Sequence, residues 1–417
     1  MLRSVQQHRT DRRSSGKMAA TAGYFGAFIV LGLAVAALGP TLPSLAANTR
    51  TSLGSISLLF TAHSLGYLLS AIFGGRLYDR LPGHPVLVVG LLVAAAMLAL
   101  VPLIPELWLL FAILLVEGAA AGTLDIGGNT LLVWVHRERV GPFMNALHFF
   151  FGVGAVLSPI IIAGLVALSG GITWAYWVLA LLALPAPLWL LPRPSPTAPA
   201  AAEDEPSGGV KLVLVALIAL LFFLYVGAEL GFGGWVYTYA LTLGLGTATS
   251  AAYLTSAYWG ALTAGRLLAI PLAARVRPRW ILAGSLVGGL LSIGLIMLWP
   301  QSTVVLWVGA LGMGLFTGPV FATVMVLAGR HMTITGQITG RFFVGSSLGG
   351  MFLPWLIGQL FVPAGPQVLL IAVLVDLALA LGALAAFLWQ SERAATQASA
   401  QARGPATRGQ VSKDRLR

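Results

Sequence analysis

The sequence is defined first by what it has little of, which is charge, and by what it lacks, which is cysteine. Charged residues make up 9% of its 417 residues, whereas soluble globular chains carry roughly 25%. A soluble domain with so few charges could not cover its surface, so the hydrophobic residues, 58% of the chain, must face lipid. The lack of cysteine excludes disulfides and thiolate metal sites. This composition predicts a membrane protein.

Several functional motifs are missing as well. The sequence contains no cluster of metal ligands, no nucleophile motif and no phosphate-binding loop, so we expect neither an enzyme nor a bound metal or cofactor. The formal net charge of +11 would suit a nucleic-acid-binding protein, but the basic residues stand in short clusters between apolar runs. That distribution is typical of loops beside a membrane, and no nucleic-acid partner is expected.

Long apolar runs are what the sequence contains instead. A helix needs about 20 consecutive, mostly apolar residues to cross the hydrocarbon core. The first such run is too long for the core of a signal peptide, so it counts as a span. The chain is predicted to hold twelve spans in two sets of six, at residues 18–43, 53–75, 86–104, 107–135, 143–168, 172–191, 212–241, 250–274, 281–299, 303–328, 337–361 and 367–389.

These spans divide the chain into five parts. The linker between the two sets is rich in proline, alanine and acidic residues, which indicates flexibility, and the last segment is polar enough to be disordered. The predicted parts are a cytoplasmic tail (1–17), a six-helix bundle (18–191), a cytoplasmic linker (192–210), a second six-helix bundle (211–389) and a disordered cytoplasmic tail (390–417).

Lysine and arginine predict the orientation, because the cytoplasmic loops of membrane proteins carry an excess of both. With the N-terminus inside, 23 of the 24 basic residues lie on the cytoplasmic side or near inner helix ends, and Arg50 alone lies outside. Both termini are therefore expected in the cytoplasm, which requires an even number of spans.

The loop after the second span reads GGRLYDRLPGH at residues 74–84. It resembles the G-x-L-x-D-R-x-G-R/K signature of the major facilitator superfamily, with Pro82 inserted and His84 in place of a basic residue. In that family the motif is a clasp that holds the inner side closed, so the resemblance implies a gating role; an ordinary basic loop is the alternative. The predicted gating residues in this loop are Gly75, Asp79 and Arg80.

The start of this motif occurs again in the second set of spans. Gly75-Arg76-Leu77 follows the second span, and Gly265-Arg266-Leu267 lies near the end of the eighth. Two halves with matched features indicate the parallel repeat of major facilitator transporters, whose site lies between the halves. Arg266 therefore joins the predicted gating residues. The predicted fold is an all-α membrane protein with two pseudo-symmetric six-helix bundles.

Acidic residues inside the predicted spans mark functional positions, because a charge at the bilayer centre costs about 2.5–3.5 kcal/mol on insertion scales. Glu117 and Asp125 lie on the fourth span, Glu229 on the seventh and Asp376 on the twelfth. Asp125 shares a helix face with Asn129, four residues later, and the pair is suited to a polyol, a proton or Na⁺. The predicted coupling residues are Asp125, Glu229 and Glu117.

Polar and aromatic residues on the fifth and seventh spans complete the predicted site. Asn145 and His148 share one face of the fifth span. Tyr225 and Trp235 lie on the seventh, where the glycines within 231–234 are expected to loosen the helix. Anchoring at the membrane interface is the alternative for Trp235. The predicted substrate-binding residues are Asn129, Asn145, His148, Tyr225 and Trp235, while a structural role is favoured for His63 and Asp376.

Three segments resemble the sodium-dependent glucose transporter branch of the superfamily. They read GTLDIGGNTLLVWVHRERVGPFMNALHFFFGVGAVLSP (122–159), YVGAELGFGGWVYTYA (225–240) and YWGALTAGRLLAI (258–270). The first is also similar, more distantly, to bacterial L-fucose:proton symporters, which carry an acid where Asp125 stands. Those symporters also have an aspartate on the first helix, where this chain has no acid. The resemblance implies cation-coupled uptake of a monosaccharide, with Na⁺ or H⁺ as the coupling ion.

The sequence therefore predicts a secondary active transporter of a small polar solute, with a monosaccharide favoured. The alternative is an exporter of drugs or metabolites, because antiporters of the superfamily carry a Gly-Pro pair on the fifth helix and this chain has Ser158-Pro159 there. The expected partners are a small-molecule substrate and the lipid bilayer, with the chain a monomer. The expected location is a cell membrane, of the bacterial inner-membrane type.

Overall fold

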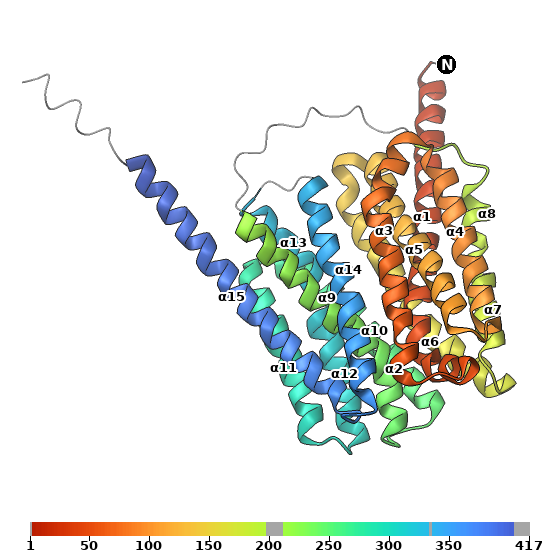
Figure 1. Cartoon of the computed structure of the whole chain (residues 1–417). Helices are drawn as coiled ribbons and strands as arrows, with labels where there is room; N and C mark the ends of the chain where they lie inside the picture. The colour runs from red at the N-terminus through yellow and green to blue at the C-terminus, as the bar shows by residue number, and fades with distance from the viewer. Residues whose placement is uncertain (1, 197–211, 333–335, 404–417) are drawn as a thin grey trace, which may run out of the picture.

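The computed structural model describes residues 2–196, 212–332 and 336–403, and all its elements are helices (Figure 1). The first half of the chain forms α1 (Leu2–Thr49), α2 (Leu53–Ile56), α3 (Leu58–Arg80), α4 (Gly83–Leu100), η1 (Val101–Leu103), α5 (Leu107–His136), η2 (Arg137–Arg139), α6 (Val140–Ser169), α7 (Thr173–Ala183) and α8 (Pro185–Leu190). The second half forms α9 (Leu212–Thr242), α10 (Ala248–Ala273), α11 (Pro278–Leu298), α12 (Thr303–Thr317), α13 (Val320–Gly329), α14 (Gly336–Phe361) and α15 (Val368–Arg403).

The apolar length of these helices suits a membrane. Within the described residues, ten segments are long and apolar enough to cross one. One of them, Leu107–Ser169, contains α5 and α6 in succession, whereas α10 is not among the ten. The serines, threonines and tyrosines of α10, together with Arg266, lower its mean hydropathy. The expected all-helical membrane fold is confirmed.

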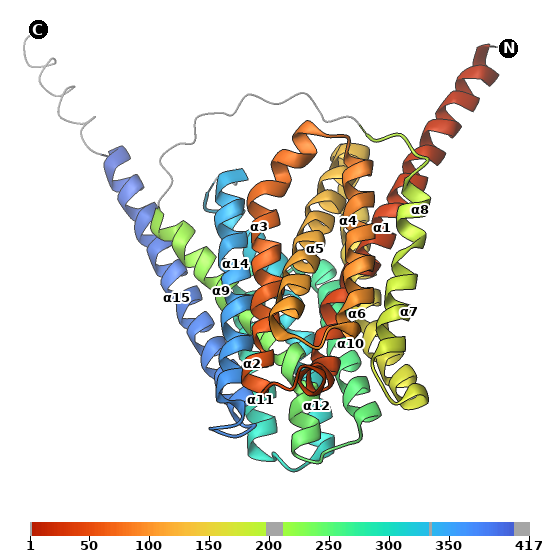
Figure 2. The ribbon, with the colours of Figure 1, turned by 45° about the vertical axis from the view of Figure 1, so that its right-hand side comes forward.

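The two halves repeat the same helix pairings. In the first half α1 packs on α6, and α5 packs on both α3 and α4; in the second, α9 packs on α14, and α12 packs on both α10 and α11. Figures 1 and 2 show α3, α4 and α5 toward the N-terminus and α9, α14 and α15 away from it. The linker that would join the halves, expected at 192–210, lies outside the described residues from position 197 onward.

Glycines let the paired helices approach closely. A Cβ on Gly118 of α5 would overlap the backbone carbonyl of His63 on α3, and a Cβ on Gly66 of α3 would overlap that of Leu115 on α5. Small residues at such crossings allow backbone-to-backbone contact between membrane helices. These crossings hold the polar residues of α3 and α5 side by side.

The halves meet at one end of the bundle. There the Nε2 of Gln359 donates to the Gly54 carbonyl at 2.7 Å, and the Ser57 hydroxyl donates to the Trp355 carbonyl at 3.4 Å. These bonds join α2 and α3 of the first half to α14 of the second. We call this end, where α1 and α14 finish, the closed end. The opposite end, where α3, α10 and α13 finish, is called the open end.

Several boundaries differ from the sequence-based expectation. α9 is continuous through residues 231–234, so the expected loosening of the helix there is wrong. Its glycines instead leave room for the rings of Phe60, Tyr258 and Trp259, which pack against them. α15 continues to Arg403, so residues 390–403 are helical where a disordered tail was expected, because this stretch is rich in strong helix formers. Residues 404–417 lie outside the described residues.

Candidate functional site

A cavity of about 520 Å³ lies between the two halves, within the size range of small-molecule sites. Helices α1, α3, α5 and α6 line it from one side, and α9, α10, α13 and α14 line it from the other. At the closed end the lining residues Gly39 and Gly233 are buried, whereas at the open end Ala273 and Arg330 are exposed. The cavity is therefore reached from the open end.

Asp125 faces this cavity from α5. The Tyr67 hydroxyl on α3 donates to its Oδ2, and the Asn129 amide donates to its Oδ1 at 2.9 Å. The expected pairing of Asp125 with Asn129 on one helix face is thus present. Asn129 itself is not among the cavity-lining residues, so its amide serves Asp125 in this conformation. Its predicted substrate contact stays a prediction.

Glu117 lies two turns before Asp125 and also lines the cavity. Its Oε2 lies 2.6 Å from the Nδ1 of His63 on α3, and both side chains are largely buried, with 3% and 15% exposed. Pairing between buried groups offsets part of the cost of removing charge from water. The expectation of a purely structural His63 did not anticipate this contact, since nothing in the spacing along one helix reveals a partner on another.

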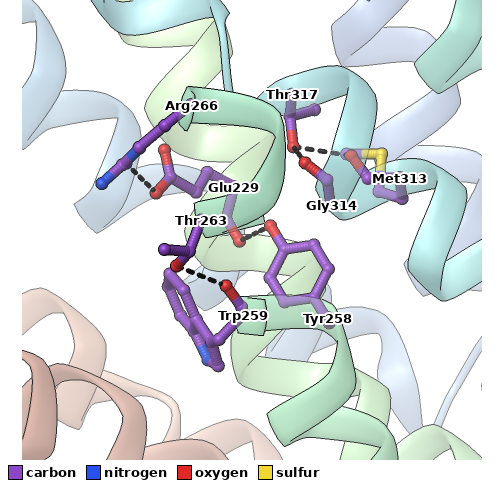
Figure 3. A network of polar contacts seen from close by, with 8 residues as sticks. All are labelled: Glu229, Tyr258, Trp259, Thr263, Arg266, Met313, Gly314 and Thr317. Atoms are coloured by element: carbon purple, nitrogen blue, oxygen red, sulfur yellow. Dashed lines mark hydrogen bonds and ion pairs between the residues drawn. The ribbon is translucent and has the colours of Figure 1, made fainter. Parts of the chain in front are cut away.

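Glu229 on α9 is held by a permanent charge. The Nη2 of Arg266 on α10 donates to its Oε1 at 3.1 Å, and the Tyr258 hydroxyl donates to the Glu229 main-chain carbonyl at 3.0 Å. Figure 3 shows Arg266 and Glu229 side by side, with Thr263 and Trp259 one and two turns away on α10. Arg266 was predicted as a gating residue and Glu229 as a coupling residue; the structure brings them together as one ion pair.

Arg266 also faces the first half across the cavity. It lies close enough to interact electrostatically with Asp125 and His148. Its guanidinium sits 5.6 Å from the centre of the Phe151 ring on α6, a cation–π distance. One arginine of the second half thus pairs with a carboxylate of its own half and shares the cavity with a carboxylate of the other half.

The predicted substrate-binding residues fall into two groups. Asn145 and His148 on α6 line the cavity. Tyr225 and Trp235 on α9 do not: both are fully buried, and the Trp235 Nε1 donates to the Pro354 carbonyl at 2.9 Å while its ring stacks on Phe361. The sequence correctly places these two residues on one helix, α9. Periodicity alone cannot show which face of that helix meets the other half of the protein.

The predicted clasp residues lie at the open end of the bundle. Gly75, Asp79 and Arg80 lie exposed at the end of α3. Of the three salt bridges within the described residues, none involves Asp79 or Arg80. In this structure the cavity opens at the same end, so a clasp that closes this end would be released here. The gating role therefore stays a prediction.

Several cavity residues were not predicted from the sequence, among them one tryptophan and one serine. Trp259 on α10 and Ser347 on α14 both line the cavity. Trp259 lies seven residues before Arg266, which places both on one helix face, and this spacing was the signal available. Ser347 stands in a helix with no acidic neighbour to mark it, so only the fold reveals it.

Comparison with known proteins agrees with this geometry. The model of the Major Facilitator Superfamily matches residues 24–354. The sodium-dependent glucose transporter 1 of Xenopus laevis is 32% identical over 358 residues, covering 79% of this chain and 73% of that protein. The Homo sapiens protein of the same name is 30% identical, covering 80% and 72%. The major facilitator superfamily domain-containing protein 4A of Mus musculus is 25% identical, covering 83% and 86%.

A solved structure shows the same fold. The crystal structure of the nucleoside transporter NupG superposes with a TM-score of 0.70 at 14% identity, covering 89% of this chain and 99% of that one. The family match spans most of the chain, and the helix pairings repeat in two halves around a central cavity. The chain belongs to the major facilitator superfamily of transporters.

Proposed function

We propose that this protein is a secondary active transporter of a monosaccharide, working by alternating access. The observation that carries the proposal is the cavity between the halves, open at one end, with polar groups from both halves on its walls. Alternating access requires such a site, because the substrate must contact each rigid body in turn. The relatives named sodium-dependent glucose transporter 1 favour a hexose as the substrate.

The chemistry of the walls suits a neutral polyol. Three carboxylates line the cavity, from Glu117, Asp125 and Glu229, against two guanidiniums, from Arg266 and Arg330, so the formal charge of the wall is negative by one. A surplus of negative charge disfavours anions, whereas hydroxyl groups both donate to carboxylates and accept from amides. The aromatic rings of Phe28, Phe60 and Phe151 add apolar faces on which the C–H surface of a sugar ring can stack.

The two carboxylates without a fixed countercharge, Glu117 and Asp125, would bind the coupling ion, Na⁺ or H⁺. Charged groups in the membrane interior are costly and commonly mark ion pathways. Counterflow of labelled D-glucose in proteoliposomes, with a Na⁺ gradient, a proton gradient or neither, tests the proposal. We expect concentrative uptake under one of the two gradients. Counterflow that is absent for every monosaccharide, together with proton-driven extrusion of lipophilic cations, would instead support the exporter suggested by Ser158-Pro159.

We further propose twelve spans, both termini in the cytoplasm, and the open end facing inward, in a cell membrane. The basic residues support this orientation, because cytoplasmic loops carry an excess of them. Arg80 and Arg330 lie at the open end, where α11 also starts at Pro278, whereas Arg50 lies at the closed end. Single cysteines are clean reporters in a chain without native cysteine. Ser169→Cys should react with an impermeant maleimide from outside, and Glu138→Cys only after the membrane is opened; the reverse pattern would overturn the orientation.

A further inference from the structure

Three buried polar atoms, each on a residue that lines the cavity, have no hydrogen-bond partner within the described residues. They are the Oε1 of Glu117, the Nε1 of Trp259 and the Oγ of Ser347, and all three are buried. More than about nine in ten buried polar groups in proteins are hydrogen-bonded, so each exception needs a reason. The other unpaired groups, on Tyr225, Thr238, Arg279 and Asp376, do not line the cavity.

Two of the three, Trp259 and Ser347, have a satisfied counterpart of the same residue type nearby in the fold. Trp235 donates its Nε1–H to the Pro354 carbonyl at 2.9 Å, whereas the Trp259 N–H has no acceptor. Ser346 donates to the Phe342 carbonyl one turn back at 3.2 Å, whereas its neighbour Ser347 makes no such bond. The unpaired state is therefore not a property of the residue type, since Ser346 also lines the cavity and is satisfied.

The three atoms stand on different walls of the same cavity. The six-membered ring of Trp259 lies over Gly233 and beside Phe151, on the side formed by α9, α10 and α6. Glu117 reaches the cavity from α5, next to His63 on α3. Helix α3 in turn touches α14, where the Ser64 hydroxyl lies 3.1 Å from the position of a Cβ on Gly350, one turn after Ser347.

We propose that Glu117 Oε1, Trp259 Nε1 and Ser347 Oγ form a hydroxyl-binding subsite that orients the sugar between the halves. A sugar O–H donates to Glu117 Oε1, a second sugar oxygen accepts from the Trp259 N–H, and Ser347 donates or accepts. This assignment rests on the proposed transport of a monosaccharide. It selects Trp259 and Ser347 as sugar ligands in place of Trp235 and Ser346. The latter two already donate hydrogen bonds to main-chain carbonyls.

Paired substitutions test the assignment by calorimetry with D-glucose and purified protein. Trp259→Phe removes the N–H while keeping an aromatic ring, and we expect binding about ten-fold weaker, since loss of one hydrogen bond to a buried group has that size. Trp235→Phe is the control: it removes a bonded N–H elsewhere, so the melting temperature should fall while the dissociation constant changes less than two-fold. Ser347→Ala should also weaken binding about ten-fold. Ser346→Ala removes a cavity-lining hydroxyl that is already bonded to the Phe342 carbonyl, so it should change the dissociation constant less.

Deoxy sugars separate a direct bond from a general disturbance. The 1-, 2-, 3- and 6-deoxy analogues of D-glucose are measured on the wild type and on Trp259→Phe. On the wild type, we expect one analogue to bind about ten-fold more weakly than D-glucose. On Trp259→Phe, the same analogue should bind as tightly as D-glucose does, because the bond to the missing hydroxyl is already lost. Equal weakening of every analogue by Trp259→Phe, or wild-type affinity in both Trp259→Phe and Ser347→Ala, would overturn the subsite. A wild type that binds no monosaccharide at millimolar concentration would overturn the proposed function itself.

Discussion

The two halves hold their carboxylates in opposite ways. In the first half Asp125 is bonded to Tyr67 and Asn129, and Glu117 to His63, all of which can be electrically neutral. In the second half Glu229 is bonded to Arg266, which is charged at every physiological pH. A carboxylate with a fixed countercharge has no need of a cation, whereas one held by neutral donors gains from a bound proton or Na⁺.

This difference indicates a division of labour between the halves. The first half would bind and release the coupling ion. The second half would contribute the Glu229–Arg266 ion pair to the cavity wall. Arg266 lies near Asp125 as well as Glu229, so occupation of Asp125 by a cation would change the field that Arg266 experiences. The sequence alone ranked Glu229 beside Asp125 as a coupling residue, and the following experiments test whether the halves differ as the structure indicates.

The largest effect is expected from Asp125→Asn. An amide cannot exchange a proton or neutralise a Na⁺ ion, so gradient-driven accumulation should be abolished while passive exchange of labelled sugar survives. Accumulation and exchange are measured in the same proteoliposomes. Glu106→Gln, an exposed acid at the start of α5, is the control and should transport normally. Accumulation at the wild-type rate by Asp125→Asn would move the coupling role to Glu117 or Glu229.

The fixed pair in the second half should matter for stability more than for coupling. Arg266→Gln leaves Glu229 buried and unpaired, which should destabilise the protein by about 3 kcal/mol, the usual cost of breaking one partner of a buried pair. Adding Glu229→Gln should restore the melting temperature measured in detergent. The double variant should still show cation-dependent accumulation. A stable double variant that exchanges sugar but no longer accumulates it would show that the halves share the coupling.

A smaller effect is expected where a neutral donor is removed. Asn129→Ala takes one hydrogen bond from Asp125, so the coupling-ion concentration that gives half-maximal uptake should change about ten-fold. The dissociation constant for D-glucose should change less than two-fold, because the Asn129 side chain does not line the cavity. Loss of sugar affinity with unchanged ion dependence would restore the direct substrate contact predicted from the sequence.

The smallest effect is expected at the open end. Asp79→Ala removes an exposed carboxylate that makes no salt bridge in this conformation, so the folding and the sugar affinity should be unchanged. If Asp79 pairs only when this end closes, turnover at saturating sugar should slow several-fold. Glu138→Ala, another exposed acid at the same end, is the control. Equal turnover in the two variants would reduce the loop motif to a signal of topology.

Much of the site could be predicted because helical periodicity is local. The spacing of Asp125 and Asn129 correctly predicted a shared face, and Asn145 and His148 correctly predicted a shared cavity wall. Trp235 shows what periodicity along one helix does not determine. Its helix was identified, but its side chain points to α14 and not to the cavity, because the packing of the two halves selects the face.

The sequence by itself determined the class of protein: so little charge and so many long apolar runs permit only a membrane-embedded helical chain. It also determined the family, because the loop motif and the repeated Gly-Arg-Leu are local in sequence. Only the tertiary structure decided the partners of the buried charges. His63 meets Glu117, and Arg266 meets Glu229, because glycine-lined crossings bring separate helices together. Such pairings are set by packing between helices, which no periodicity within one helix records.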